Sequence, residues 1–263
     1  MKFEILIEKV INSGIKACFK ILEIYHKDFE VYEKADLSPV TEADLASTKI
    51  LEQGLSEIGL PIISEEKEIP PFETRKKFSS YFLIDPLDGT KEFIGKTDEF
   101  CINVALVKDN EPVLGFIFDP IERQVIFGGT FLDEVKLLEF NEHGTYSEKE
   151  FDISNSREEN DGLRFICSRR ADIKRLKSSA QERFESEKIE IITKGSALKF
   201  IDLALGRADY YLRFGKTMEW DIAPGFAILK QLKGSIDHVD KNVPLEFNKE
   251  NLLNPPFIAY KNR

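Results

Sequence analysis

Cysteine and histidine are scarce in this chain of 263 residues, which has three of each. The cysteines lie far apart in apolar runs: Cys18, Cys101 and Cys167. An odd number at this spacing argues against a disulfide framework or a zinc site, so we expect buried thiols. The histidines are also isolated from one another: His26, His143 and His238. No pair has the spacing of metal ligands, so neither zinc binding nor histidine-based catalysis is indicated.

Long apolar runs and basic runs are missing too. No stretch approaches the ~20 apolar residues of a membrane span. The N-terminal segment Met1–Ile5 mixes charged with apolar residues, unlike a signal peptide. We therefore expect a cytoplasmic protein and leave a peripheral association with the inner membrane open. The formal net charge of −10 disfavours nucleic acid polymers as partners. A small anionic substrate is compatible with this charge if the site supplies its own cations.

Hydrophobic periodicity predicts a mixed α/β chain without repeats. Helices are expected over 3–25 and 42–58, the second capped by Thr41. Short strands are expected next, at 61–63, 81–84, 101–107, 113–118, 125–127 and 135–140. Further strands are expected at 163–167, 189–192, 210–212, 234–236 and 257–260, with helices at 171–184, 196–205 and 221–232. The polar segment 141–161 predicts a boundary between two subdomains, 1–150 and 151–263, of one compact unit.

The most informative segment is Leu83–Thr90, with the sequence LIDPLDGT. An apolar strand reaches Asp85, Pro86 is expected to end its hydrogen-bond ladder, and Asp88 follows on the same tight turn. Two carboxylates held this close repel, and each raises the other's pKa unless a cation lies between them. Magnesium is the natural cation because it prefers carboxylate oxygens. The alternative is a simple turn in which Asp85 caps a helix and Asp88 is solvated.

Other acidic residues offer further ligands, although each also has an ordinary explanation. Glu65 follows a short apolar strand and could belong to a charged loop. Asp221 lies at a helix start, where the helix dipole favours an acid in any case. The segment Thr41–Asp44 resembles a capping box. Gly89 permits a positive φ, so that the next N–H groups would face an anion at a helix start.

Together these segments resemble the signature of the inositol monophosphatase superfamily. The matching strings are Lys34–Asp44, Ile63–Glu66, Asp85–Phe93 and Trp220–Asp221. One branch, the bacterial 3′(2′),5′-bisphosphate nucleotidases, is resembled further by Thr90–Phe93, Lys194–Phe200, Arg213–Gly215 and Leu253–Pro255. The resemblance covers about residues 3–260.

The resemblance implies a five-layer α-β-α-β-α sandwich of the α/β class, with two or three Mg²⁺ ions in a cleft between its halves. The implied reaction is hydrolysis of adenosine 3′,5′-bisphosphate to AMP and phosphate, with sensitivity to lithium. The implied ligands of the first ion are Glu65, Asp85 and the carbonyl of Leu87, and those of the second are Asp85, Asp88 and Asp221.

The same resemblance implies roles around the metals. Attacking water would be oriented and deprotonated by Glu65 with the pair Asp44 and Thr90. The substrate would be held by Gly89, Thr90, Ser196, Lys199, Arg213 and Asp221. Lys199 and Arg213 would meet the second phosphate, whereas simple solvation is the alternative for both.

Two positions depart from the family pattern. Pro224 replaces a small residue, and we expect it in the first helical turn, where proline is tolerated. The segment Cys167–Asp172 lacks a histidine, so that Arg169 or Arg170 would have to stack on the adenine.

Two alternative functions are kept beside the nucleotidase. The closest is an inositol monophosphatase or broad sugar-phosphate phosphatase, and one of another class is a non-catalytic nucleotide- or metal-binding module. The sequence leaves the preferred substrate and the oligomeric state, monomer or homodimer, open.

Overall fold

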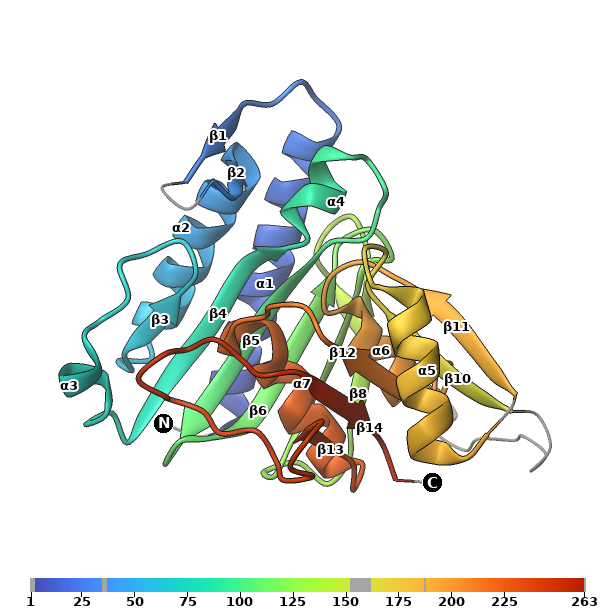
Figure 1. Cartoon of the computed structure of the whole chain (residues 1–263). Coiled ribbons are helices and arrows are strands. Elements are labelled where there is room, and N and C mark those ends of the chain that lie inside the picture. Colours follow the sequence, from blue (N-terminus) through green and yellow to red (C-terminus); the bar gives the residue numbers. More distant parts are fainter. Residues whose placement is uncertain (1–2, 35–36, 152–161, 187, 263) are drawn as a thin grey trace.

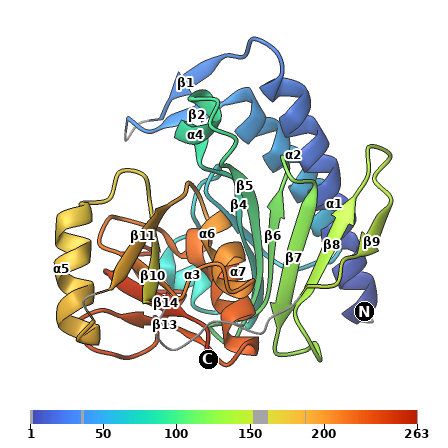
Figure 2. The ribbon, with the colours of Figure 1, turned by 90° about the vertical axis from the view of Figure 1, so that its right-hand side faces the viewer.

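The computed structural model describes residues 3–34, 37–151, 162–186 and 188–262, which form stacked layers of helices and sheets (Figures 1 and 2). The outer helices α1 (Phe3–Tyr25) and α2 (Glu42–Ser56) cover one face of a seven-stranded sheet. Helices α6 (Leu198–Ala204) and α7 (Glu219–Gln231) lie between this sheet and a five-stranded sheet. Helix α5 (Ile173–Phe184) covers the far face of the smaller sheet. The expected α-β-α-β-α sandwich is confirmed.

The large sheet has the strand order β3-β4-β5-β6-β7-β8-β9. Its strands are β3 (Ile62–Ser64), β4 (Ser80–Asp88), β5 (Cys101–Lys108), β6 (Glu111–Asp119), β7 (Gln124–Gly129), β8 (Lys136–Phe140) and β9 (Tyr146–Glu148). β3 pairs with β4 in parallel, and the other neighbours are antiparallel. The carboxyl ends of β3 and β4 therefore lie at the same edge of the sheet.

The small sheet has the order β11-β10-β12-β14-β13. Its strands are β10 (Leu163–Cys167), β11 (Ile189–Thr193), β12 (Tyr210–Arg213), β13 (Ser235–His238) and β14 (Phe257–Tyr260). β10 is parallel to β11 and β12, whereas β14 runs antiparallel to β12 and β13. A separate hairpin joins β1 (Val31–Glu33) to β2 (Pro39–Thr41), and short helices form at α3 (Phe72–Arg75) and α4 (Thr90–Ile94).

The largest core cluster joins the two halves of the chain. It combines side chains from the large sheet with those of α6, α7 and the small sheet, such as Leu83, Phe200 and Phe257, all nearly inaccessible to water. Helix α7 approaches β6 so closely that a Cβ at Gly115 would come within 2.2 Å of the Pro224 carbonyl oxygen. Only glycine allows this approach, which brings the N-terminal end of α7 to the carboxyl end of β4.

Several expectations about local structure need correction. Pro224 is the sixth residue of α7, beyond the first turn, so its missing N–H leaves the Trp220 carbonyl without the usual helical donor. Helix α6 begins at Leu198 rather than 196, because Ser196 has a φ of 44°, outside the α-helical range. Strand β9 and the hairpin β1–β2 were not predicted, because these short strands lack the apolar run that marks β3.

The boundary predicted in segment 141–161 lies partly outside the described residues, since 152–161 are not among them. The strands of the large sheet end at Glu148 and those of the small sheet begin at Leu163. The division at 150 stays a prediction, because α6 and α7 share a core with the large sheet.

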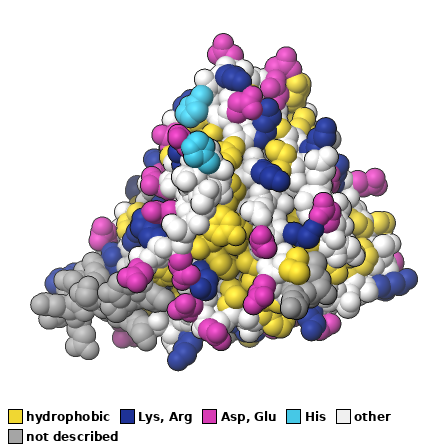
Figure 3. Space-filling view, turned by 180° about the vertical axis from the view of Figure 1, so that it is seen from behind, with side chains coloured by type: hydrophobic (Ala, Val, Ile, Leu, Met, Phe, Trp, Pro, Cys, Tyr) yellow, Lys and Arg dark blue, Asp and Glu magenta, His cyan; other side chains and the backbone are white. Residues whose placement is uncertain are grey.

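The surface and the helices show two further properties. The face seen in Figure 3 interleaves acidic with basic side chains around exposed hydrophobic ones, so this view shows no extended basic field. Among the described residues, no helix combines the length and the hydropathy needed to cross a membrane.

Candidate metal centre

A bulge in β4 places two acids on the same side of the sheet. Asp85 pairs with Asn103 and Asp88 with Cys101, so three steps along β4 match two along β5. Side chains of a regular strand alternate, and residues three apart would point to opposite faces. The extra residue restores an even spacing and aims both carboxylates the same way. The ladder expected to stop at Pro86 therefore continues through a bulge to Asp88.

Three acids from distant segments converge beside this bulge. One ligand oxygen each of Glu65, Asp85 and Asp221 lies within 4.8 Å of the other two. Glu65 comes directly after β3, and its N–H donates to the Ile84 carbonyl at 3.2 Å, next to Asp85. Asp221 is the third residue of α7, where its Oδ2 accepts the Met218 N–H at 2.8 Å. The parallel strand pair and the start of α7 therefore assemble one carboxylate cluster.

Asp88 lies next to this cluster but makes different contacts. Its Oδ2 accepts the Ala197 N–H at 2.5 Å and the Asn103 Nδ2–H at 3.3 Å. The thiol of Cys101 lies 3.9 Å from the same oxygen. One carboxylate oxygen therefore receives all three donors, which leaves the Oδ1 atom for another partner.

The electrostatics of the cluster call for a cation. Burial, followed by repulsion from Glu65 and Asp88, raises the pKa of Asp85 well above its usual value. Burial and the charges of Asp88 and Glu65 likewise raise the pKa of Asp221. Burial raises the pKa of Asp88 to about 6, although nearby Lys199 opposes the shift. A divalent ion between these groups would remove the repulsion.

The donor set fits magnesium. The clustered oxygens are carboxylates, and the Leu87 carbonyl, which accepts the Thr90 hydroxyl at 3.3 Å, lies on the same bulge. Hard oxygen ligands with few protein contacts are typical of Mg²⁺ sites. Zinc sites usually include histidine or cysteine ligands. The ligand group found among the described residues contains only carboxylates. The division of Leu87 and the acids between separate ions stays a prediction.

The pair Asp44 and Thr90 is assembled as the sequence suggested. Asp44 Oδ2 accepts the Thr41 N–H at 2.7 Å, which completes the capping box of α2. Its other oxygen accepts the Thr90 hydroxyl at 3.1 Å. Asp44 therefore has both of the roles that had been considered as alternatives: it caps a helix and it orients Thr90. Gly89 has a φ of 94°, the positive value that only glycine adopts easily, and Thr90 begins α4.

Three residues around Glu65 were not assigned from the sequence. The indole N–H of Trp220 donates to Glu65 Oε2 at 3.0 Å. Lys34 Nζ lies 3.0 Å from Glu65 Oε1 and 2.6 Å from Glu66 Oε1. Both glutamates raise the pKa of Lys34 against the effect of its burial. Burial raises the pKa of Glu66 to about 7. The one sequence signal for the indole contact is that Trp220 directly precedes the candidate ligand Asp221.

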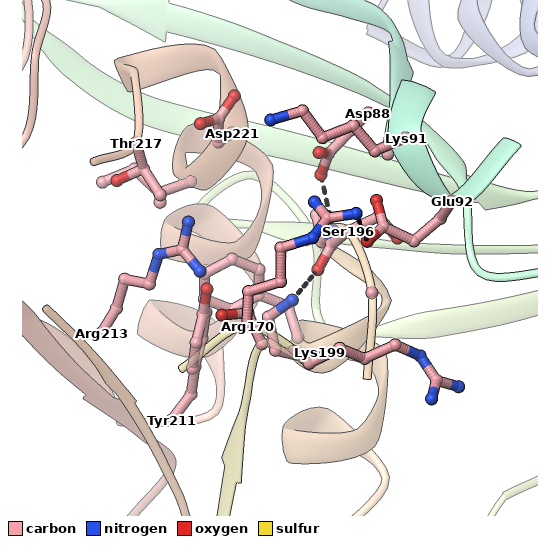
Figure 4. A pocket seen from close by; sticks show the side chains of 17 residues that line it. Asp88, Lys91, Glu92, Arg170, Ser196, Lys199, Tyr211, Arg213, Thr217 and Asp221 are labelled. Atoms are coloured by element: carbon pink, nitrogen blue, oxygen red, sulfur yellow. Dashed lines mark hydrogen bonds and ion pairs between the residues drawn. The ribbon is translucent and has the colours of Figure 1, made fainter. Parts of the chain in front are cut away.

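A cavity of about 280 Å³ opens beside the carboxylates (Figure 4). Its lining includes the acids Asp88, Glu92 and Asp221 together with basic residues from four segments: Lys91, Arg169, Arg170, Lys199 and Arg213. In Figure 4, Lys91 points toward Asp221, while Arg170 and Arg213 reach the cavity from other elements. The protein therefore supplies the local cations that its net charge demands.

Five of the six predicted substrate residues line this cavity, namely Gly89, Ser196, Lys199, Arg213 and Asp221, whereas Thr90 is not among the lining residues. Lys199 is buried, and its ammonium donates to the carbonyls of Lys194, at 3.1 Å, and Ser196. Burial lowers the pKa of Lys199 to about 8. The Ser196 hydroxyl accepts the Leu198 N–H at 3.4 Å, and its role as a substrate ligand stays a prediction. Arg213 donates to the Gly215 carbonyl at 3.3 Å, so its guanidinium lies over its own loop.

The two arginines considered for adenine stacking differ. Arg169 forms two hydrogen bonds of 2.6 Å with the Glu99 carboxylate, so its guanidinium is already paired. Arg170 is mostly exposed and lies 3.8 Å from Glu92. Arg170 is therefore the freer of the two.

The layered fold and the carboxylate centre define a metal-binding protein of the α-β-α-β-α class. A model of the inositol monophosphatase family matches residues 5–261. The 3′(2′),5′-bisphosphate nucleotidase CysQ of Haemophilus influenzae is 34% identical over 267 residues, covering 97% of this chain and 92% of its own length. The chain belongs to the inositol monophosphatase family.

Solved structures agree with this placement. The crystal structure of CysQ from Bacteroides thetaiotaomicron, a bacterial member of the family, is 31% identical and has a TM-score of 0.86, covering 100% of this chain and 99% of that one. An IMPase/NADP phosphatase complexed with Mg²⁺ and phosphate is 16% identical with a TM-score of 0.74, covering 97% of this chain and 90% of that one. This second likeness supports the fold alone.

Proposed function

We propose that this chain is a magnesium-dependent phosphomonoesterase that hydrolyses adenosine 3′,5′-bisphosphate to AMP and phosphate. The observation that carries the proposal is the cavity that joins Asp88 and Asp221, two acids beside or within the carboxylate cluster, to five basic side chains. A monophosphate needs only the metal side, whereas a bisphosphate uses both. The relatives described as 3′(2′),5′-bisphosphate nucleotidases support the same substrate.

Magnesium is the proposed metal, in two sites with a third left open. When bound, the ions would lower the pKa of the attacking water and stabilise the leaving oxygen. Glu65, Asp85 and the Leu87 carbonyl would hold one ion, and Asp85, Asp88 and Asp221 the other. The all-carboxylate cluster of Glu65, Asp85 and Asp221 supports this choice.

The protein's own groups would position the reactants. The Thr90 hydroxyl donates to Asp44, so its oxygen can accept a hydrogen bond from the attacking water and orient the proton that this water loses. Glu65, fixed by Trp220, would take up or relay that proton. The N–H groups of Gly89 and Thr90 would hold phosphate oxygens, because first-turn amides lack partners within the helix. Such positioning and charge stabilisation account for most of phosphoryl transfer catalysis.

Lys199, Arg213 and Ser196 would meet the second phosphate. Lys199 lies at the base of the cavity with its charge 5.2 Å from the centre of the Tyr211 ring, and Arg213 reaches the cavity from the end of β12. Both guanidinium contacts of Arg213 are to carbonyls of its own exposed loop, so it can turn toward an anion at little cost. Charge-assisted hydrogen bonds are typically the stronger ones.

A phosphate-release panel tests this function. It compares adenosine 3′,5′-bisphosphate, its sulfated analogue, inositol 1-phosphate and fructose 1,6-bisphosphate, each with and without magnesium. We expect magnesium-dependent release with the highest kcat/KM for adenosine 3′,5′-bisphosphate. A preference for inositol 1-phosphate would replace the nucleotidase assignment with the inositol phosphatase one. No release from any substrate would favour a binding module.

A further inference from the structure

The loop between β11 and α6 connects the small sheet to the metal centre. This loop, Lys194–Ala197, ends at the Ala197 N–H that donates to Asp88 Oδ2 at 2.5 Å. Ser196 within it has a φ of 44°, an unusual value for a residue with a side chain. A loop in this conformation needs contacts that hold it in place.

Glu99, in the turn before β5, supplies such contacts. Its Oε2 accepts the Gly195 N–H at 2.7 Å and the Arg169 Nε–H at 2.6 Å. Its Oε1 accepts a second guanidinium N–H of Arg169, also at 2.6 Å. One carboxylate therefore links three segments: the turn before β5, the loop after β10 and the loop after β11.

Main-chain packing shows how close these segments lie. A Cβ at Gly195 would come within 2.7 Å of the Glu99 carbonyl oxygen. A Cβ at Gly89 would come within 2.9 Å of that same oxygen and 3.2 Å of the Ser196 Cβ. Glycines at both positions let the turn at Glu99 lie between Gly89 and the Lys194–Ala197 loop.

The charge of Glu99 suits this arrangement. Its side chain is only 16% exposed, whereas that of Arg169 is 46% exposed. Burial opposes the charged form, but Arg169 and the Gly195 N–H together lower the pKa of Glu99 below its usual value. Glu99 therefore stays ionised and keeps its acceptors available across the neutral range.

We propose that Glu99 is a positioning residue that holds the Lys194–Ala197 loop against Asp88 and so sets the orientation of this ligand. Glu99 does not line the cavity, and it acts on Asp88 through Gly195 and Ala197. Without it the loop loses its anchor on the large-sheet side, and Asp88 loses a fixed donor. This inference rests on the proposed function only for its kinetic consequence.

The test compares Glu99→Ala with Glu99→Gln, whose amide oxygen still accepts the Gly195 N–H. The control is Glu139→Ala on β8, which removes an exposed ion pair between Glu139 and Lys149. Mn²⁺ affinity is measured by electron paramagnetic resonance on the full chain, and kcat by phosphate release. We expect Glu99→Ala to weaken Mn²⁺ binding about fivefold and to lower kcat about tenfold. The tenfold lower kcat corresponds to an activation free energy about 1.4 kcal/mol higher. Glu99→Gln should recover most of both, and Glu139→Ala should match the unmodified chain.

Two results would overturn the proposal. One is unchanged Mn²⁺ affinity in Glu99→Ala. The other is a loss in Glu99→Gln as large as that in Glu99→Ala, since the Gly195 anchor would then not matter. If the unmodified chain binds Mn²⁺ but releases no phosphate, the proposed function fails alone, and the Mn²⁺ affinities of the two variants still decide on Glu99.

Discussion

Asp88→Asn separates catalysis from stability. Asn can place its amide oxygen where Asp88 Oδ2 accepts Ala197 and Asn103, so the hydrogen bonds at this position are kept. What disappears is the negative charge, which burial and nearby Glu65 make costly, as the pKa raised to about 6 shows. We therefore expect the metal-free variant to be more stable than the unmodified chain.

The magnitude and its pH window follow from the pKa. The pKa of Asp88 rises from 3.8 to about 6 on folding. Each unit corresponds to about 1.36 kcal/mol, so the charge costs up to about 3 kcal/mol. The folded chain binds the proton more tightly, so this cost is absent below about pH 4 and complete above about pH 6. The substitution should thus raise the melting temperature of the metal-free chain by several degrees at pH 8 and by little at pH 4.

Thermal unfolding in a chelator at pH 4 and pH 8 measures this difference, with the exposed Asp240→Asn as control. Magnesium should reverse the order, because it stabilises only the chain with the complete ligand set. Turnover of the variant should fall more than about tenfold. A metal-free variant that is less stable than the unmodified chain at pH 8, or one that retains most of its kcat, would refute the reasoning.

Three further predictions concern substrate, ligand orientation and lithium. Lys199→Met or Arg213→Ala should lower kcat/KM for adenosine 3′,5′-bisphosphate about 10- to 100-fold and barely change that for a monophosphate; equal losses on both substrates would contradict a role at the second phosphate. As Lys199 has a pKa of about 8, the KM for the bisphosphate should also rise above pH 8, and Lys199→Met should remove this dependence. Trp220→Phe removes the N–H that orients Glu65 and should raise the half-saturating magnesium concentration about tenfold, whereas an unchanged concentration would show that the contact is dispensable. Lithium should inhibit at millimolar concentration with an uncompetitive or mixed pattern, and purely competitive inhibition would exclude trapping after turnover.

Much of the local structure is readable from the chain itself. The apolar periods of α1 and α2 and the alternating second half predict those elements, because each carries its own spacing signal. The Thr41 cap follows from one residue and its neighbours. The start of α6 is not readable in this way, because Ser196 adopts a positive φ only within its surroundings.

The sequence by itself singled out Glu65, Asp85 and Asp221 as candidate ligands, and the structure brings their carboxylates within 4.8 Å of one another. Tertiary structure alone decided how they meet. The bulge in β4 aims Asp85 and Asp88 the same way, and the packing of α7 on β6 brings Asp221 to them. Lys199 is a second example. The sequence identifies it as a basic residue near the start of a helix, but its contacts and its lowered pKa follow from its burial beside backbone carbonyls and Tyr211. Distances between residues more than a hundred positions apart depend on the packing of whole layers, which no local pattern encodes.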